Sequence, residues 1–139
     1  MIALPTNRLL HVLGYIALAL SLGCSNGDRP PLGEVTGVVT LDGQPAAGLG
    51  ILFKKDGFRS SSGVTNENGE YELKYIKKVL GAVVGEHKVR IQPLAAEGAN
   101  RKGRRIPPRY NRESELTATV KTGSNTFNFD LFSDGEPPG

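Results

Sequence analysis

Short runs in which apolar and polar residues alternate are the feature that most constrains the fold of this chain. A period of two places successive side chains on opposite faces of a β-strand. Regularly spaced short strands separated by Gly- and Asx-containing turns are typical of a two-sheet sandwich. We therefore expect an all-β domain of about seven strands and no helix in the mature chain. The runs lie at 35–41, 49–53, 60–65, 71–75, 87–91, 116–120 and 127–131.

Turn residues mark where these strands should end. Asp42-Gly43 closes the first run, and Asn68-Gly69 predicts a hairpin between 60–65 and 71–75, because both residues of such a pair tolerate positive φ. Residues 66–69 lack the spaced aspartates and the final glutamate of an EF-hand loop, which favours a turn over a calcium site. We also expect a turn at 123–125 and a long charged loop at 93–114.

The composition limits what can stabilise the domain and what it can bind. The chain has one cysteine and no tryptophan, so an internal disulfide is excluded and Val, Ile, Leu, Phe and Tyr must fill the core. Residues 1–23 contain one charged residue, Arg8. Their removal leaves 16 of the 17 Lys and Arg residues, compared with 14 Asp and Glu residues. A net charge of +2 does not favour nucleic-acid binding, for which a strongly basic face is typical.

The N-terminal segment has the pattern of an export signal. Arg8 precedes an apolar stretch at 9–22, which as a helix would rise about 21 Å and fall short of a hydrocarbon core of about 30 Å. A short apolar stretch of this kind indicates a cleavable signal rather than a membrane span. We expect a signal peptide at 1–23, a Pro- and Gly-containing tether at 24–33, the sandwich at 34–132 and a polar tail at 133–139.

Ser21-Leu22-Gly23-Cys24 resembles the bacterial lipobox, although Ser21 stands where that motif usually has leucine. The resemblance implies that Cys24 is lipidated, for example with palmitate, and becomes the first residue of a protein held on the membrane by its lipid anchor. Ser25, in place of Asp after the cysteine, implies delivery to the outer membrane of the cell envelope. The alternative is an ordinary secretory signal in which the cysteine is incidental.

Three further motifs resemble a carboxypeptidase-regulatory-like domain. They lie at 35–48, at 65–73, where Asn66 replaces the usual Asp, and at 85–91, where His87 replaces a common aromatic residue. The resemblance spans about Gly33 to Leu131 and implies a transthyretin-like (prealbumin-like) β-sandwich. Together with the lipobox, segments 106–111 and 125–131 resemble small lipoproteins of planctomycete-type bacteria. This resemblance implies a fold and a location, and it implies no reaction.

Few residues of the mature chain suggest chemistry. A lone histidine on a strand, His87, is more typical of packing than of catalysis or metal binding, so we expect no catalytic residues, no metal and no cofactor. One cluster exceeds what a scaffold needs, and we name residues 101–112 the basic segment. Its cations could contact an anionic ligand, with the Tyr110 ring stacking on a sugar. The expected contacts are Arg101, Lys102, Arg104, Arg105, Arg109, Tyr110 and Arg112.

These features predict a non-enzymatic, lipid-anchored envelope protein with a binding, adhesion or structural role. Its partner would be an anionic or glycan ligand, or a protein of the envelope, contacted through the loop at 93–114. One alternative is an accessory subunit that docks on an envelope enzyme or transporter. Another is a hydroxyisourate-hydrolase-like enzyme, whose family ends in Tyr-Arg-Gly-Ser, whereas this chain ends with 135–139 as Gly-Glu-Pro-Pro-Gly.

Overall fold

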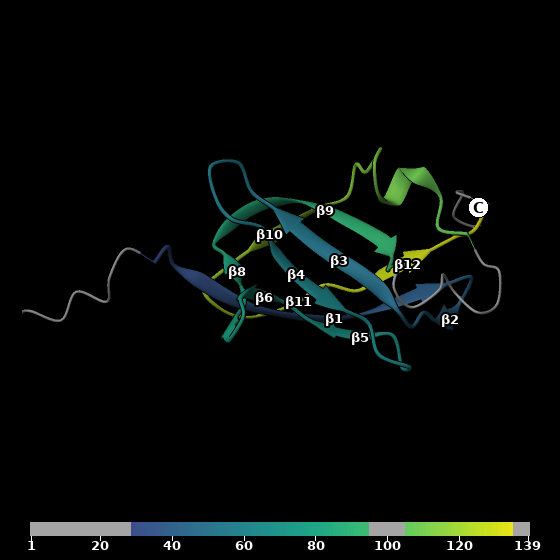
Figure 1. The fold of residues 1–139 in the computed structure, drawn as a ribbon, viewed down its shortest axis with the longest axis horizontal. Helices are drawn as coiled ribbons and strands as arrows, with labels where there is room; N and C mark the ends of the chain where they lie inside the picture. The colour runs from purple at the N-terminus through teal and green to yellow at the C-terminus, as the bar shows by residue number, and fades with distance from the viewer. Residues whose placement is uncertain (1–28, 95–104, 135–139) are drawn as a thin grey trace, which may run out of the picture.

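The computed structural model describes residues 29–94 and 105–134. These residues form two β-sheets packed as a sandwich (Figure 1). Apart from one short 3-10 helix, η2 (Pro108–Tyr110), the regular structure in these ranges is β-strand. No helix within them is long and apolar enough to cross a bilayer. The prediction of an all-β sandwich is confirmed. The predicted signal peptide, Cys24 and most of the polar tail lie outside the described residues.

The first sheet is built around one long strand, β1 (Leu32–Leu41), in which alternate residues are buried. One edge of β1 pairs in parallel with segments from the C-terminal part of the chain, and the other edge pairs antiparallel with three short segments. Because β1 begins at Leu32, the folded domain starts two residues earlier than expected. The partners of β1 are β11 (Gly123–Thr126), β12 (Phe129–Leu131), β2 (Gln44–Pro45), β5 (Glu70–Glu72) and β8 (Ala82–Val83).

The second sheet is antiparallel, with strand order β10-β9-β3-β4-β6-β7. Its centre is the pair β3 (Leu49–Lys54) and β9 (Gly85–Pro93), in register from Leu49 opposite Pro93 to Lys54 opposite Lys88. The alternation at 49–53 and 87–91 therefore produces the expected buried face. The outer strands are β4 (Ser61–Val64), β6 (Lys74–Ile76), β7 (Val79–Leu80) and β10 (Thr117–Val120).

The chain crosses between the sheets twice in the segment 70–83, once inside the expected strand at 71–75 and once at Gly81. β5 pairs with β1 in the first sheet, whereas β6 pairs with β4 in the second. Between them, Leu73 is fully buried, its N–H donates to Val35 O at 2.9 Å, and its carbonyl accepts from Gly81 N at 2.8 Å. Gly81 is the second crossing, because β7 before it belongs to the second sheet and β8 after it belongs to the first. The described residues consequently contain twelve strand segments, where about seven strands were expected.

The Asn68-Gly69 turn leads from β4 in the second sheet to β5 in the first, and the predicted hairpin is formed only in part. The runs 60–65 and 71–75 do pair antiparallel, with Ser62 of β4 opposite Lys74 of β6. The expected pairing of the nearer residues is wrong, because β5 pairs with β1 instead. The turn itself is present. The Oδ1 of Asn66 accepts hydrogen bonds from the N–H groups of Asn68 at 3.0 Å and Glu70 at 2.9 Å. This side chain thereby fixes the turn, as Asx residues commonly do.

The turn expected at 123–125 is also wrong. Gly123 to Thr126 forms β11, which pairs in parallel with Gly33 to Thr36. The Nδ2 of Asn125 donates to Glu34 O at 3.0 Å and to Lys121 O at 2.7 Å. Polar residues that resemble a turn in sequence are therefore used to attach the C-terminal part of the chain to β1.

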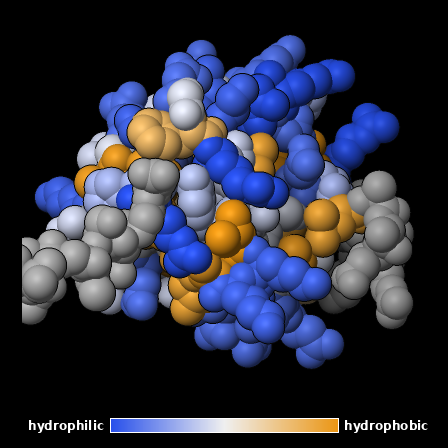
Figure 2. Space-filling view, turned by 60° about the vertical axis from the view of Figure 1, so that its left-hand side comes forward, coloured by the Kyte–Doolittle hydropathy of each residue, from blue (hydrophilic) through white to orange (hydrophobic). Residues whose placement is uncertain are grey.

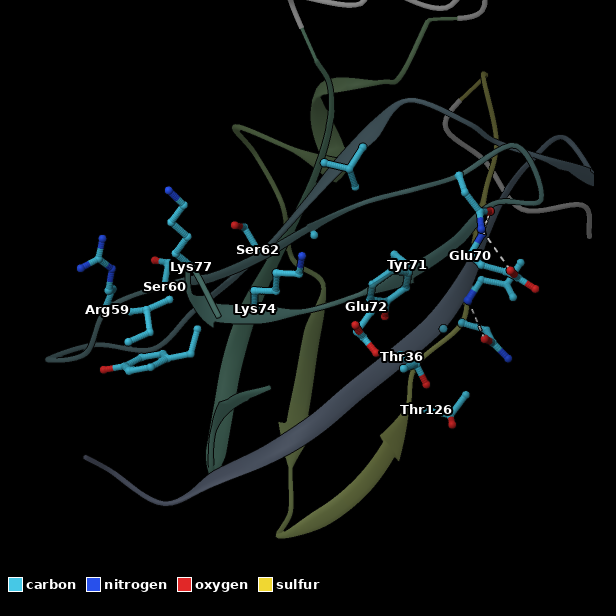
Figure 3. Close-up of a pocket in the computed structure, with 18 residues that line it drawn as sticks. Thr36, Arg59, Ser60, Ser62, Glu70, Tyr71, Glu72, Lys74, Lys77 and Thr126 are labelled. Atoms are coloured by element: carbon cyan, nitrogen blue, oxygen red, sulfur yellow. Dashed lines mark hydrogen bonds between the residues drawn. The ribbon is translucent and has the colours of Figure 1, made fainter. Parts of the chain in front are cut away.

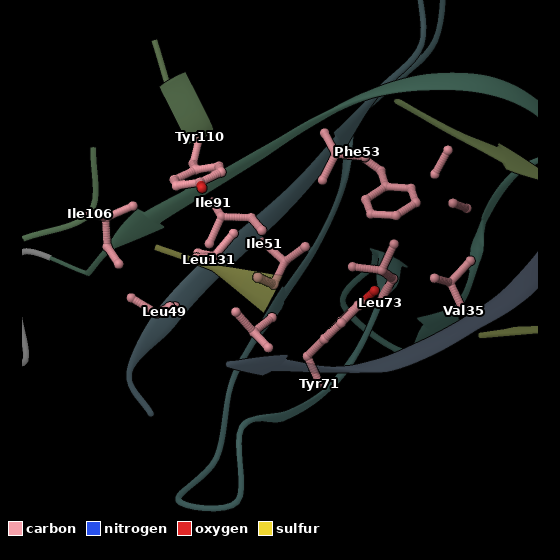
Figure 4. Close-up of a cluster of buried hydrophobic side chains, with 14 of the residues drawn as sticks. Val35, Leu49, Ile51, Phe53, Tyr71, Leu73, Ile91, Ile106, Tyr110 and Leu131 are labelled. Atoms are coloured by element: carbon pink, nitrogen blue, oxygen red, sulfur yellow. The ribbon is translucent and has the colours of Figure 1, made fainter. Parts of the chain in front are cut away.

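The core lies between the sheets and is filled by the predicted aliphatic and aromatic side chains (Figure 4). Phe53 is fully buried at its centre, with ring centroids 5.9 Å from Phe127 and 6.5 Å from Phe129. His87 is 1% exposed, and its ring lies 5.6 Å from that of Phe53. The Nε2 of His87 is 2.6 Å from Val83 O. His87 is thus a packed core residue.

Only part of the expected loop at 93–114 is described, and that part is packed. Pro93 is the last residue of β9, and residues 95–104 lie outside the described ranges. Ile106 and Tyr110 are buried in the core cluster. The buried Ser114 donates from Oγ to Val89 O at 2.5 Å. Residues 106–114 therefore cover one end of the core instead of forming a solvated loop.

Candidate functional site

Outward-facing side chains line up across the seam where the two sheets meet. In the first sheet, Thr36 of β1 stands opposite Thr126 of β11 on one side and Glu72 of β5 on the other. In the second sheet, Ser62 of β4 stands opposite Lys74 of β6. These two rows face solvent on neighbouring strands, because β4 runs beside β5.

The backbones of β4 and β5 approach closely at Gly63. A Cβ atom at this position would lie 2.4 Å from Glu72 O, so no larger residue fits without displacement of one strand. The contact joins the outer faces of the two sheets into one continuous surface. A single side chain at position 63 would push the two rows apart.

This surface holds an open groove with a volume of about 1320 Å³. Figure 3 shows the side chains of β1, β4, β5 and β6 arranged around it. Hydroxyl groups of Thr36, Ser60, Ser62 and Thr126 line the groove, and Ser60 lies beside Arg59 at one end. The half-buried Tyr75 is also part of the lining. The lining is mixed, because Val38, Ile76 and the exposed Val64 contribute apolar side chains beside the polar ones.

Charges are segregated along the groove. Arg59, Lys74 and Lys77 are exposed and lie toward one end, whereas Glu70 is at the other end, with Glu72 between (Figure 3). Among the described residues, none of the three cations makes an ion pair or a hydrogen bond. Glu70 accepts a hydrogen bond from Asn66 Nδ2 at 3.1 Å. The cationic end can therefore receive an anionic group without breaking an existing interaction.

The described residues of the groove contain no arrangement for nucleophilic catalysis. Ser60 and Ser62 line it, but His87, the one histidine in the described ranges, is buried in the core and is not part of the lining. No group of three His, Cys, Asp or Glu side chains in those ranges could hold a metal ion. What the groove offers is a set of charged and hydrogen-bonding groups.

Tyr71 forms the buried floor of the groove. Its hydroxyl donates to Phe127 O at 2.6 Å, and its ring stacks on Phe129 with centroids 6.4 Å apart. Burial raises the pKa of this phenol above its ordinary value. The residue is consequently a neutral donor that supports the site from beneath.

The basic segment does not contribute to the groove, and three of its six cations are described. Arg105, Arg109 and Arg112 are exposed, whereas Arg101, Lys102 and Arg104 lie outside the described residues. The segment includes η2, which lies at the opposite end of the sandwich from the start of β1 (Figure 1). None of these described arginines lines the groove.

The expected ligand contact of Tyr110 is wrong. Its side chain is 5% exposed, and its hydroxyl accepts a hydrogen bond from Phe132 N at 3.2 Å. The guanidinium of Arg109 lies over the ring at 5.3 Å from the centroid. A ring buried in the core and covered by its neighbour cannot stack on a sugar.

The sequence pattern did not identify the groove. Ser62, Glu72 and Lys74 are the outward residues of alternating strands, which is the usual position of solvated side chains. Their convergence depends on the passage of the chain between the sheets at Leu73, for which the sequence carries no distinct signal.

Comparisons with known proteins add little about activity. No family model matches the chain, and no curated protein matches it. Among solved structures, the chain is similar to a DUF3823 family protein from Parabacteroides merdae, with 17% sequence identity and a TM-score of 0.45. The similarity covers 74% of this chain and 47% of that protein, so the chain spans about half its length. A likeness of this degree carries no information on ligand or partner, and the carboxypeptidase-regulatory-like and lipobox resemblances stay predictions.

Proposed function

We propose that this protein is a non-enzymatic binding module of the bacterial envelope, held there by a lipid on Cys24, that binds an acidic polysaccharide. The carboxypeptidase-regulatory-like, transthyretin-like relationship is part of the same proposal. The observation that carries it is the groove, with Arg59, Lys74 and Lys77 unpaired among the described residues toward one end. Carboxylate or sulfate groups along a sugar chain would pair with these cations.

The rest of the groove suits a carbohydrate. Sugar hydroxyls both donate and accept hydrogen bonds, and the lining supplies the hydroxyls of Thr36 and Ser62 and the carboxylate of Glu72 as partners. The groove is open along its length, so a polymer can pass through it without an end entering a closed cavity. Charge-assisted hydrogen bonds at the cationic end would provide most of the selectivity for an acidic chain over a neutral one.

The test is retention of the full-length, detergent-solubilised protein on immobilised alginate, a polyuronate, compared with neutral dextran. The double variant Arg59→Gln with Lys74→Gln should bind alginate about tenfold more weakly, since two exposed cations contribute together about 1.4 kcal/mol. The matched control, Arg105→Gln with Arg112→Gln, removes the same charge from the basic segment and should bind like the unmodified protein.

Three results would contradict the proposal. Equal retention on alginate and dextran would exclude selectivity for acidic sugars. Loss of binding in the Arg105 and Arg112 variant alone would move the site to the basic segment. Recovery from membranes of one stoichiometric protein partner, with no alginate binding, would favour the accessory-subunit alternative.

A further inference from the structure

Several loops gather at the end of the sandwich where β1 begins. A Cβ atom at Gly81 would lie 2.4 Å from Gly33 O, which places the link between β7 and β8 beside the start of β1. A Cβ atom at Gly85 would lie 2.9 Å from Lys55 Nζ, which places the β3–β4 loop beside the start of β9. Figure 1 shows both links at the end of the sandwich where β1 begins. We name this end the anchor-proximal end.

Cations outnumber acids at the anchor-proximal end. The acids are Glu34, Asp56 and Glu86, which are fewer than the cations of the same loops and strand ends. Arg59 and Lys77 also line the groove, whereas the other cations do not. The cations are Lys54, Lys55, Arg59, Lys77, Lys78 and Lys121.

The same end exposes hydrophobic side chains. Phe58 in the β3–β4 loop is 44% exposed and Leu80 in β7 is 41% exposed. Among the described residues, Val64 in the groove is the other large hydrophobic side chain with such exposure. Lys55 Nζ lies 5.7 Å from the centroid of the Phe58 ring. In Figure 2, which turns this end toward the viewer, hydrophobic side chains lie among strongly hydrophilic ones.

Lysines interspersed with exposed Phe and Leu side chains are the combination that binds the interface of an anionic bilayer. Apolar side chains enter the boundary between headgroups and acyl chains, while the cations remain at the lipid phosphates. A polysaccharide would use the cations and the ring of Phe58 but would gain little from the aliphatic side chain of Leu80. The pairing of both kinds of side chain at one end therefore favours lipid over sugar.

Covalent geometry keeps this end close to a membrane if Cys24 is lipidated. Leu32, the first residue of β1, follows Cys24 by eight residues. Eight extended residues span at most about 29 Å. A domain tethered this tightly must meet the bilayer repeatedly, and the loops beside the start of β1 are the ones that it presents.

We propose that the anchor-proximal end docks on an anionic lipid surface, with Phe58 and Leu80 at headgroup level and the surrounding cations on lipid phosphates. The proposal rests on the lipid anchor of the proposed function for its proximity to the bilayer. Docking would orient the groove, whose cationic end lies beside this surface, at a fixed height above the membrane.

The chain has no tryptophan, so Phe58→Trp introduces a single fluorescent reporter at the predicted contact. The full-length acylated protein is reconstituted on phosphatidylglycerol vesicles and on phosphatidylcholine vesicles. We expect the emission of this tryptophan to shift to shorter wavelength, and brominated lipid to quench it, on the anionic vesicles. Gln44→Trp, in exposed β2 at the opposite end, is the matched control and should show neither effect.

Charge variants test the role of the cations. Lys54→Gln with Lys78→Gln, made in the Phe58→Trp protein, removes two charges that do not line the groove. The ratio of docked to undocked protein should fall about thirtyfold, because a cation near an anionic surface contributes about 1 kcal/mol. Arg105→Gln with Arg112→Gln should leave the ratio unchanged.

The outcomes separate failure of docking from failure of the anchor. Flotation of the vesicles in a density gradient measures whether the protein is attached to them. If the protein floats with both kinds of vesicle but the tryptophan at position 58 stays exposed to water, docking is wrong and the lipid anchor is supported. Flotation with anionic vesicles alone would support docking and contradict the anchor, and flotation with neither would overturn both. A shift of the emission by alginate that anionic vesicles do not reproduce would show that the surface binds polysaccharide rather than lipid, and the docking proposal would be wrong.

Discussion

The hydroxyl of Tyr71 donates a 2.6 Å hydrogen bond to the backbone carbonyl of Phe127, across β1 from one edge of the first sheet to the other. The same carbonyl lies against Gly37 of β1, where a Cβ atom would approach it to 1.8 Å. Phe127 N also donates to Thr36 O at 2.9 Å. The C-terminal part of the chain is thus held on β1 by backbone contacts that one side chain from β5 secures.

Gly37→Ala should destabilise the domain by about 3 kcal/mol, the upper end of the usual cost of overpacking. The added methyl group would displace Phe127 and weaken the parallel pairing of β11 and β12 with β1. Urea denaturation followed by far-UV circular dichroism measures the change.

Gly48→Ala is the control for this substitution. Gly48 has a φ of +73° but open space around the position of a Cβ atom. Alanine there should cost about 1 kcal/mol from backbone conformation alone. An equal loss in both variants would mean that the contact with Phe127 is not what position 37 requires.

Tyr71→Phe should cost about 1 to 2 kcal/mol, since it leaves Phe127 O without its hydrogen bond. It should also change the pH dependence. Burial raises the pKa of this phenol, so above its ordinary value of 10.0 the unfolded state ionises before the folded state does. Folding stability should therefore fall as pH rises above about 10, by up to about 1.4 kcal/mol per pH unit.

Denaturation at pH 9 and at pH 11 separates these two effects. Tyr71→Phe should lose less stability between the two values than the unmodified protein loses. Tyr75→Phe, at the half-buried position beside the groove, keeps the other tyrosines and controls for the number of phenols. An identical pH profile for all three proteins would exclude Tyr71 as the titrating group.

Asn66→Ala should destabilise the domain by about 1 to 2 kcal/mol, because two backbone N–H groups lose their acceptor. Asn66→Asp retains an oxygen acceptor for both groups and should cost less. It does place a second carboxylate beside Glu70, so its cost should increase at low salt. Thermal denaturation at two salt concentrations compares the variants. A larger loss for Asp than for Ala at high salt would contradict this account of the turn.

Tyr110→Ala should cost about 3 to 4 kcal/mol, in the range for a large aromatic side chain removed from a core. Arg109→Gln, which removes the cation over the ring, should cost under about 1 kcal/mol. Chemical denaturation compares the two variants. Selective loss of alginate binding in a stably folded Tyr110→Phe protein would restore the ligand role that its burial argues against.

Cys24→Ala should release the protein from membranes or block its processing, while leaving the sandwich folded. Fractionation of cells, followed by detergent phase partitioning of the membrane fraction, measures the change. A variant that still requires detergent for extraction would place the anchor elsewhere.

The alternation of residues determined which face of each main strand is buried. At 35–41, 49–53 and 87–91 the apolar positions face the core, because side chains of a strand alternate regardless of the strand's neighbours. The apolar composition likewise predicted which residue types fill the core. In the same way, the cations that the sequence singled out are exposed where they are described.

Only the tertiary structure decided which strands pair and which polar residues converge. The passage through Leu73 moves Glu72 and Lys74 onto different sheets, although they are two residues apart and share one alternation. Gly123 to Thr126 reads as a turn, yet it pairs with β1 through main-chain hydrogen bonds that any residue except proline can form. Tyr110 follows a run of cations but is buried, because the chain around it closes one end of the core. Local sequence specifies the face that a strand buries, whereas pairing depends on contacts between segments far apart in the chain.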